Sequence, residues 1–405
     1  MFNPSTKRFS ALATAFAAVA LTAVACGGGD DAPAAAAAPS ASPLDNRTIS
    51  GLNLIGQQVI ARRTQFQDTV IGGLSGVEYD AANKRFLFIS DDRTTTDSAN
   101  PPRMYTANLN YDAAGFTGVT FLSTIKMKQP NGSDYAKVPD ATVADPEAVR
   151  IDPVTGNYVW VSEGDRTLTS TPTRVINPFI REIRPDGTHV REYTLPSMFA
   201  MSATETGPRG NAVFEGLAFT PDKTKAVVIM EGALFQDGTS PTNTTGSVAR
   251  ITVFDRATGL ASAQYAYRID PVQVLSTPTG SFTVNGPTEI LALSNTRFLV
   301  LERSFSVGVV GNQVRLYEID ISAATNVLTT PALAGASYTA VTKKLVLNFE
   351  TIKPRVGQIA NLEGITFGPR LPNGRDTLVV VADDNFPTAD SETDRNQILV
   401  FEVVP

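Results

Sequence analysis

Acidic residues recur at two positions of a sequence unit that is repeated five times along the chain. When the units are aligned on their apolar residues, one acid opens the first β-like run and another follows the second. The first positions are Ser75, Glu147, Glu215, Glu289 and Glu363, and the second positions are Asp91, Glu163, Glu231, Glu302 and Asp383. Nine of these ten positions are acidic, although only 40 of the 405 residues are Asp or Glu. Because hard cations prefer carboxylate oxygens, the pattern predicts a metal site, with Ca²⁺ as the first candidate and Mg²⁺ or Mn²⁺ behind it.

Carboxylates that lie close together need a positive partner. Like charges raise one another's pKa values and destabilise the folded chain. A bound metal ion is one possible partner. Arginine is the other, because Arg93, Arg166 and Arg303 follow second-position acids by two, three and one residues, and Arg150 lies inside the second unit. Backbone N–H groups at tight corners could also satisfy the acids, so the sequence leaves both interpretations open.

The units that carry these acids are typical of β-hairpins. Each has a short β-like run, a turn, and a strongly apolar second run. They span residues 74–93, 146–166, 214–234, 288–305 and 362–386. In an antiparallel hairpin, the start of the first strand and the end of the second lie at the same end. We therefore expect both acids of every unit at one end of its hairpin.

The spacing of the units predicts an all-β fold, a β-propeller with four-stranded blades. The units start about 70 residues apart, which leaves room for two more strands in each blade. This gives five blades, and residues 327–348 could form a degenerate sixth. The last blade lacks a fourth strand, whereas residues 49–61 form an unpaired β-like run before the first unit. We expect this N-terminal run to close the ring by joining the last blade, which removes an exposed sheet edge.

The N-terminal residues have the pattern of an export signal. Lys7 and Arg8 precede a short apolar stretch that ends in Ala23-Val24-Ala25-Cys26, as in bacterial lipoproteins. We expect residues 1–25 to be a lipoprotein signal peptide, Cys26 to be lipidated, and the Gly-, Ala- and Pro-rich residues 26–47 to be a flexible tether. The folded domain is then residues 48–405. The alternative is an ordinary signal peptide that leaves a free thiol. Because Gly27 follows the cysteine, we expect an outer-membrane anchor facing the periplasm or the cell surface.

Composition excludes several other classes of function. A net charge of −6 argues against nucleic acid as a partner, because binding to the phosphate backbone needs a cationic face. The chain has one cysteine and one histidine, so it has no internal disulfide, and a zinc site or a serine triad is disfavoured. We expect a monomer whose membrane contact is through its lipid alone.

Several short motifs at these positions resemble the phytase-like domain family, which is described as having esterase-like activity of phytase. The motifs are Gly73-Leu74-Ser75-Gly76-Val77, Pro146-Glu147-Ala148, Phe214-Glu215-Gly216-Leu217, Leu301-Glu302-Arg303 and Asn361-Leu362-Glu363-Gly364. The resemblance extends over residues 50–404 and implies a propeller hydrolase related to calcium-dependent propeller phosphatases. It implies that the matched acids bind calcium and that a metal-bound water is the attacking group. No separate phosphate-cradling motif is present, so the resemblance leaves phytate open as the substrate.

These observations favour a calcium-dependent hydrolase of a small-molecule ester, with phosphate esters first. In that hypothesis Arg93, Arg166 and Arg303 bind the anionic substrate. One alternative is a calcium-dependent lactonase or carboxylesterase, which would need fewer cations and a more apolar pocket. The other is a non-enzymatic binding propeller at the cell surface. Fold alone does not distinguish these functions.

Overall fold

The computed structural model describes residues 46–93, 100–136, 138, 140 and 142–405. The expected signal peptide, Cys26 and nearly all of the expected tether lie outside the described residues. Within the described part, strands dominate and no helix has the length and apolar character needed to cross a membrane. Long-range contacts begin with the first described residues, since Asn46 accepts a hydrogen bond from Arg297 and the Arg47 side chain bonds Asp376 at 3.0 Å.

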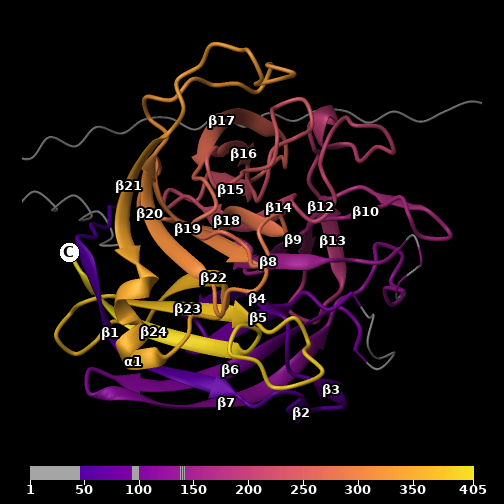
Figure 1. The fold of residues 1–405 in the computed structure, drawn as a ribbon. Helices are drawn as coiled ribbons and strands as arrows, with labels where there is room; N and C mark the ends of the chain where they lie inside the picture. The colour runs from indigo at the N-terminus through magenta and orange to yellow at the C-terminus, as the bar shows by residue number, and fades with distance from the viewer. Residues whose placement is uncertain (1–45, 94–99, 137, 139, 141) are drawn as a thin grey trace, which may run out of the picture. The chain divides into compact units, whose positions relative to one another are not determined.

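Among the described residues, five four-stranded antiparallel sheets form the blades of a propeller, as the sequence predicted (Figure 1). Blade 1 consists of β4 (Leu74–Asp80), β5 (Arg85–Ser90), β6 (Arg103–Asp112) and β7 (Gly115–Lys126). Blade 2 consists of β8 (Pro146–Ile151), β9 (Tyr158–Ser162), β12 (Phe179–Ile183) and β13 (His189–Glu192). Blade 3 consists of β14 (Phe214–Phe219), β15 (Lys225–Met230), β16 (Ser247–Asp255) and β17 (Ala261–Ile269).

The two remaining blades complete the ring. Blade 4 consists of β18 (Thr283–Ala292), β19 (Arg297–Ser306), β20 (Gln313–Asp320) and β21 (Thr342–Asn348). Blade 5 consists of β22 (Asn361–Gly368), β23 (Thr377–Asp383), β24 (Asn396–Val404) and β1 (Gly51–Ile60). Short elements in the connections are β2 (Gln65–Phe66), β3 (Thr69–Val70), β10 (Asp165–Thr167), β11 (Arg174–Ile176), the 3₁₀ helices η1 (Ser197–Phe199) and η2 (Phe349–Ile352), and α1 (Lys353–Val356).

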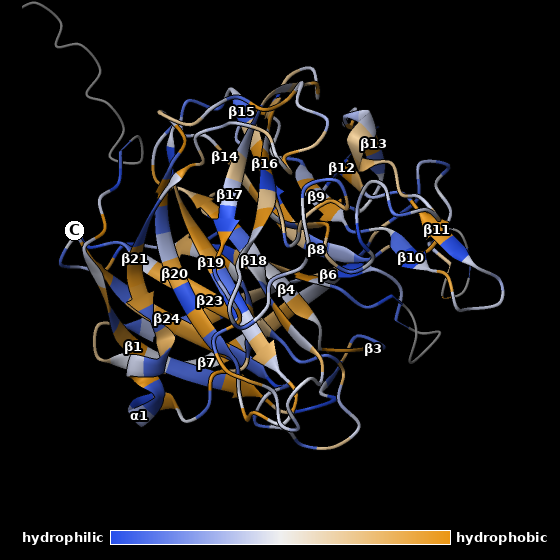
Figure 2. Cartoon of the chain, turned by 45° about the horizontal axis from the view of Figure 1, so that its top comes forward, coloured by the Kyte–Doolittle hydropathy of each residue, from blue (hydrophilic) through white to orange (hydrophobic). Residues whose placement is uncertain are grey.

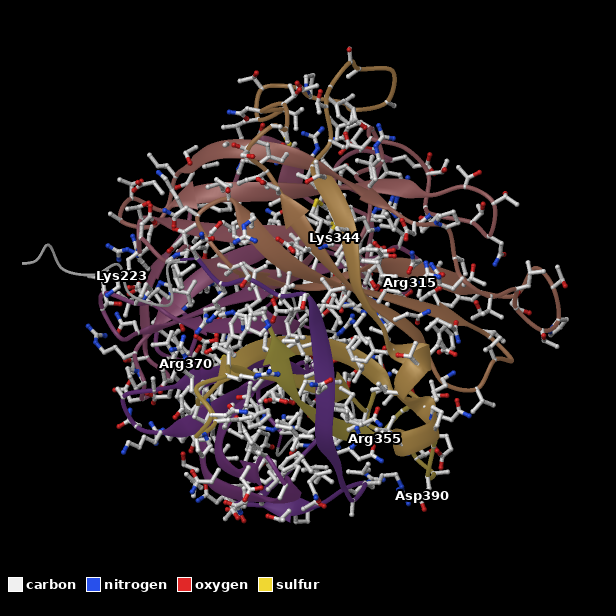
Figure 3. All side chains as sticks on the ribbon, turned by 90° about the vertical axis from the view of Figure 1, so that its left-hand side faces the viewer. Lys223, Arg315, Lys344, Arg355, Arg370 and Asp390 are labelled. Carbon is white, nitrogen blue, oxygen red and sulfur yellow. The ribbon has the colours of Figure 1, made fainter. Side chains whose placement is uncertain are left out.

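The N-terminal strand closes the ring, which confirms the prediction. β1 pairs antiparallel with β24, from Gly51 opposite Val404 to Ile60 opposite Asn396. Figure 3 shows β1 running beside the last blade, while charged side chains such as Arg355 and Asp390 lie on the outside. Residues 327–348 contain β21, the outermost strand of blade 4, so they do not form a sixth blade.

Apolar strands supply the core between the blades. The second strand of each blade is almost entirely buried, and its side chains pack against both neighbouring blades. Figure 2 shows hydrophobic residues along the strands of the blades, such as β20 and β24, and a hydrophilic α1 on the outside. The first strands β4, β8, β14, β18 and β22 lie innermost and contact one another in a ring. The ends of these first strands therefore position the groups at the mouth of the central channel.

An irregularity at the start of the first strand places an acid at this mouth. In blade 3, Phe214 pairs with Met230 and Gly216 with Ile229, so Glu215 is an extra residue in a bulge. The following glycine is required by close packing, because a Cβ at Gly216 would lie 2.5 Å from the backbone nitrogen of Ile290 in blade 4. Blades 1 and 5 have the same arrangement of a bulge followed by a glycine. The bulge directs its side chain into the mouth while the glycine lets neighbouring strands approach.

The structure corrects the sequence alignment of blade 4 by one residue. There, Pro287 pairs with Glu302 and Glu289 with Leu301. By comparison with blade 3, Thr288 occupies the bulge position and Arg303 occupies the position of the second acid. Side chains alternate between the faces of a strand, so a shift of one residue moves Glu289 and Glu302 away from the mouth.

Candidate active site

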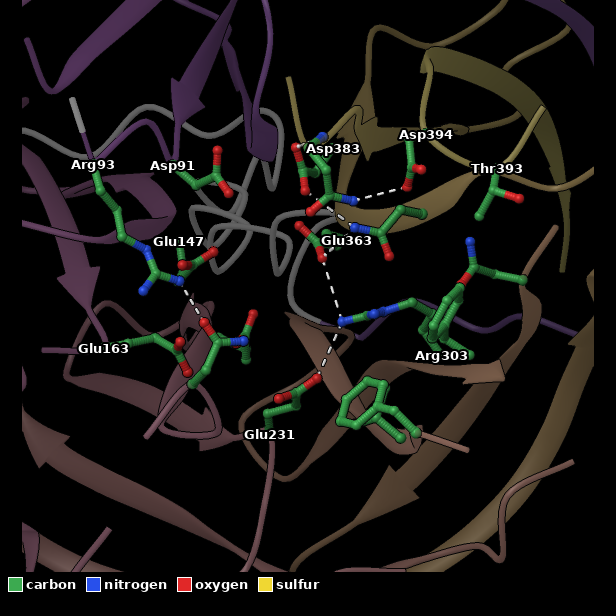
Figure 4. A pocket seen from close by; sticks show the side chains of 18 residues that line it. Asp91, Arg93, Glu147, Glu163, Glu231, Arg303, Glu363, Asp383, Thr393 and Asp394 are labelled. Atoms are coloured by element: carbon green, nitrogen blue, oxygen red, sulfur yellow. Dashed lines mark hydrogen bonds and ion pairs between the residues drawn. The ribbon is translucent and has the colours of Figure 1, made fainter. Parts of the chain in front are cut away.

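A cavity of about 330 Å³ lies at the acidic mouth of the channel. Within the described chain, seven of the nine predicted carboxylates, from blades 1, 2, 3 and 5, line it, and Figure 4 labels six of them around the cavity. These seven are Asp91, Glu147, Glu163, Glu215, Glu231, Glu363 and Asp383. Asp394, from the connection before β24, is an eighth lining acid that the sequence analysis did not identify.

The carboxylates approach closely enough to share a cation. Asp145, Glu147 and Glu163 each offer an oxygen within 4.8 Å of the others, and so do Glu163, Glu215 and Glu231. All of these residues are buried, and these two groups could therefore hold a metal ion. Asp145 was missed by the sequence analysis because it precedes the first strand, although its position two residues before Glu147 was an available signal.

Burial makes the ionised carboxylates unfavourable. It raises the pKa of Glu163 to about 7, and the neighbouring Glu231 adds to the rise. Burial likewise raises the pKa of Asp145 to about 7, although Arg93 opposes the shift. For Glu147, burial and then the charge of Glu215 raise the pKa well above its ordinary value. The site therefore stabilises protons or a metal ion in place of free negative charge.

The partners of these carboxylates separate two groups of acids. Glu163 accepts a hydrogen bond of 2.6 Å from the backbone N–H of Val213, and Asp383 accepts one of 2.7 Å from that of Asn385. By contrast, Glu147 has no hydrogen bond or ion pair within the described residues, and Oδ1 of Asp91 is buried there without a hydrogen-bond partner. Backbone donors therefore satisfy only part of the ring, and the remaining oxygens fit a hard cation.

Two of the three predicted arginines line the cavity. The Arg303 guanidinium lies between Glu231, at 3.1 Å, and Glu363, at 3.4 Å. Arg93 projects from the other side of the cavity, as Figure 4 shows, and pairs with Asp145 at 2.8 Å. Burial lowers the pKa of Arg303, but Glu363 and Glu231 raise it more, so the group stays charged. In the described chain, eight acids and two arginines line the cavity, so its acidic groups outnumber its cationic ones.

The family follows from sequence comparison. The sequence model of the family described as "Phytase-like: Esterase-like activity of phytase" matches residues 69–386. The chain belongs to the phytase-like family. This confirms the resemblance seen in its motifs, and the acidic cavity is the mouth of a phytase-like propeller. No curated protein matches the chain.

Solved structures similar to the phytase-like propeller have low sequence identity to it. An endo-arabinase from Bacteroides thetaiotaomicron is 9% identical, with a TM-score of 0.41 and coverage of 86% of this chain and 98% of that one. An α-L-arabinofuranosidase from Lactobacillus brevis is 11% identical, with a TM-score of 0.42 and coverage of 82% and 90%. A gluconolactonase from Xanthomonas campestris is 11% identical, with a TM-score of 0.31 and coverage of 80% and 70%. Similarity at this level carries no argument about function.

Glu289 lies deeper in the phytase-like propeller, where it pairs with Arg150. The two side chains are 2.9 Å apart, and Glu289 also accepts a hydrogen bond of 3.0 Å from the backbone N–H of Leu217. The Arg150 guanidinium donates to three carbonyl oxygens of other blades, those of Val77 at 2.8 Å, Ile365 at 3.0 Å and Ile290 at 3.3 Å. Arg150 therefore ties the inner strands together at the centre of the ring. It lines a second cavity of about 340 Å³, which shares no lining residue with the acidic one.

Glu302 and Arg166 also lie outside the acidic cavity. Glu302 is buried between blades 3 and 4, where it accepts hydrogen bonds from Tyr267 at 2.7 Å and Lys343 at 2.6 Å. Arg166 donates to the carbonyl oxygen of Ser202 at 2.8 Å and stacks 4.9 Å from the ring of Phe235. Each of these side chains thus has partners of its own away from the mouth.

Proposed function

We propose that the phytase-like propeller is a calcium-dependent hydrolase of phosphate esters and that the acidic cavity is its active site. The observation that carries this proposal is the set of buried carboxylates that face one cavity, among which Glu147 and Oδ1 of Asp91 have no hydrogen-bond partner in the described chain. Among the described residues that line it there is no histidine or cysteine, so the atoms that could bind a metal are the oxygens of carboxylate, amide and hydroxyl groups. An oxygen-donor set of this kind suits calcium better than zinc.

The roles of the residues follow from their positions. Asp145, Glu147, Glu163, Glu215 and Glu231 would hold the cation, since they form the two close carboxylate groups. When bound, the cation neutralises these charges and polarises a water molecule and an ester oxygen. Arg303 and Arg93 would attract the anionic ester and orient it, because both guanidinium groups line the cavity.

The proposed reaction is the hydrolysis of a phosphate monoester. The oxygen of water forms a bond to phosphorus, and the bond between phosphorus and the alcohol oxygen breaks. One proton of the water passes to the departing alcohol, and hydrogen phosphate remains. The carboxyls of Glu163 and Glu215 are in hydrogen-bond contact, so the two groups would share a proton until a cation binds.

A screen of esters with and without a chelator tests the proposal. The purified protein should contain calcium by elemental analysis and release phosphate from monoesters, and chelation should abolish the release. Glu215→Gln combined with Glu363→Gln should remove activity and metal binding, while the exposed control Glu192→Gln should retain both. Hydrolysis of carboxyl esters alone would indicate a lactonase or carboxylesterase. Stabilisation by calcium without any turnover would indicate a binding propeller.

We also propose that the chain is exported and anchored through a lipid on Cys26. The support is the sequence pattern before this cysteine. The proposal places the cavity outside the cytoplasm, where calcium sites of submillimolar to millimolar affinity can be filled. Cys26→Ser should abolish incorporation of labelled palmitate and release the protein from the membrane fraction. Unchanged membrane association in this variant would overturn the anchor.

A further inference from the structure

One wall of the acidic cavity is built by the inner hairpin of blade 4, β18 and β19, which is longer than the inner hairpins of the other blades. In blade 3 the inner hairpin begins with Phe214 opposite Met230. In blade 4 the equivalent pair is Pro287 opposite Glu302, but pairing continues outward to Thr283 opposite Ser306. Blade 4 thus extends beyond the level of the carboxylates and forms a wall on its side of the mouth.

Three apolar side chains on and beside this extension face the cavity. Phe282, Val284 and Phe305 line the cavity together with Arg303. The Phe282 ring lies 6.3 Å from that of Phe305, yet Phe282 is 65% exposed, the largest value among the exposed large hydrophobic residues described. Covering the exposed Phe282 ring and the partly exposed Phe305 ring with an apolar ligand is favourable, because it removes apolar surface from water. We call these three residues the aromatic wall.

A second observation on the same blade points to a ligand. Asn312 precedes β20, whose first residue, Gln313, pairs with Ser304 beside the aromatic wall. The Asn312 side chain lines the cavity, and its amide nitrogen and oxygen are both buried without a hydrogen-bond partner in the described chain. Buried amides without partners are costly, so this group is available to a ligand that has hydrogen-bonding atoms.

The charges of the cavity limit the ligand to few anionic groups. The two lining arginines are already paired with Asp145, Glu231 and Glu363. Beyond the cation of the proposed function, the described lining therefore offers few further positive charges to a polyphosphorylated substrate. One phosphate, held near the metal and Arg303, leaves the rest of the substrate against the aromatic wall.

From this geometry, and resting on the proposed function, we infer that the substrate class is a phosphate monoester of an apolar alcohol with the size of an aromatic ring. Phe282 and Phe305 are the specificity-determining residues, since they contact the alcohol part of the ester. The phosphate and its cation interact with the acids and arginines on the floor of the cavity. Selectivity for the alcohol is therefore separable from the hydrolysis itself.

Two esters with the same phosphate group test the inference in the full-length protein with calcium. Phenyl phosphate should have a kcat/KM at least about tenfold above that of glycerol 2-phosphate. Phe282→Ala should reduce this ratio roughly fivefold to tenfold by lowering kcat/KM for phenyl phosphate alone. Phe282→Leu should keep most of the ratio, and Leu260→Ala, which truncates another exposed apolar side chain (53% exposed) outside the cavity, should leave it unchanged.

Binding of phosphonates separates a failure of this inference from a failure of the proposed function. Calorimetry in calcium should show phenylphosphonate binding more tightly than methylphosphonate, with the difference reduced in Phe282→Ala. Equal affinities for the two phosphonates, or an equal loss of kcat/KM for both esters in Phe282→Ala, would refute the role of the aromatic wall in selectivity even if phosphate is released. If no ester is hydrolysed but the affinities differ as expected, the proposed hydrolysis fails and the selectivity stands.

Discussion

Replacement of Arg150 should reveal how much of the propeller's unfolding free energy depends on the buried ion pair between Arg150 and Glu289. Arg150→Met keeps the length and apolar stem of the side chain but removes the guanidinium. The variant loses the hydrogen bonds to Val77, Ile290 and Ile365 and leaves the Glu289 carboxylate, which is 0% exposed, without its cation. Breaking a buried pair by removing one partner costs about 3–5 kcal/mol of unfolding free energy.

The size of this effect should depend on pH. Burial raises the pKa of Glu289 to about 7 even though Arg150 opposes the shift. Without Arg150 that pKa rises further, so at pH 8 the variant must bury an unpaired charge or take up a proton. At pH 5 the carboxyl is protonated in both proteins, and the variant loses only the carbonyl bonds. The destabilisation should therefore be larger at pH 8 than at pH 5.

Urea unfolding at both pH values measures the effect. The double variant Arg150→Met with Glu289→Gln should recover about 2 kcal/mol at pH 8, because the charge of Glu289 is then removed as well, although Glu78, 3.7 Å from Arg150, still loses this cation. Arg184→Met, at an exposed position, should change the free energy by less than about 0.5 kcal/mol. A cost below about 1 kcal/mol at pH 8, or the same cost at both pH values, would refute the role given to this pair.

Two further predictions concern the acidic cavity. In the metal-free protein the free energy of unfolding should fall as pH rises from 4.5 to about 7. Burial raises the pKa of Glu163 to about 7 in the folded state, so the folded protein holds a proton that the unfolded chain has lost. This one group accounts for about 3 kcal/mol of the fall. Saturating calcium should remove most of that fall, and a flat metal-free profile in urea titrations would contradict the electrostatic account. Arg303→Gln should tighten calcium binding by roughly tenfold, since it removes the cation between Glu231 and Glu363, and should raise KM for the ester. Weaker calcium binding by calorimetry would show that Arg303 organises these acids instead of competing with the metal.

The repeated hairpins made most of the fold predictable. Alternating apolar residues and turns were sufficient for the five blades, although a sixth at residues 327–348 stayed open, and the closure by β1 followed from the missing strand. In blades 1, 2, 3 and 5 the same alignment placed seven acids at the mouth. These predictions succeeded because they depend on local pairing within a hairpin, which the sequence period determines.

Blade 4 shows where this reasoning ends. Its first strand is buried on both faces, so residues 285–293 give no alternation that would fix the register. The alignment therefore chose Glu289 and Glu302, and the true equivalents are Thr288 and Arg303. The central position of Arg150 was also beyond local patterns, because it depends on the meeting of strands far apart in the chain.

Closure of the ring by β1 and β24 sets the order in which the cavity can be completed during synthesis. Asp91 belongs to the first blade and Asp383 to the last, so these acids meet only after the end of the chain has emerged. Until then β1 has no strand to pair with, and the cavity lacks the carboxylates of blade 5. The same late step that gives the propeller its mechanical integrity therefore delays full assembly of its reactive centre, so a truncated product would lack both.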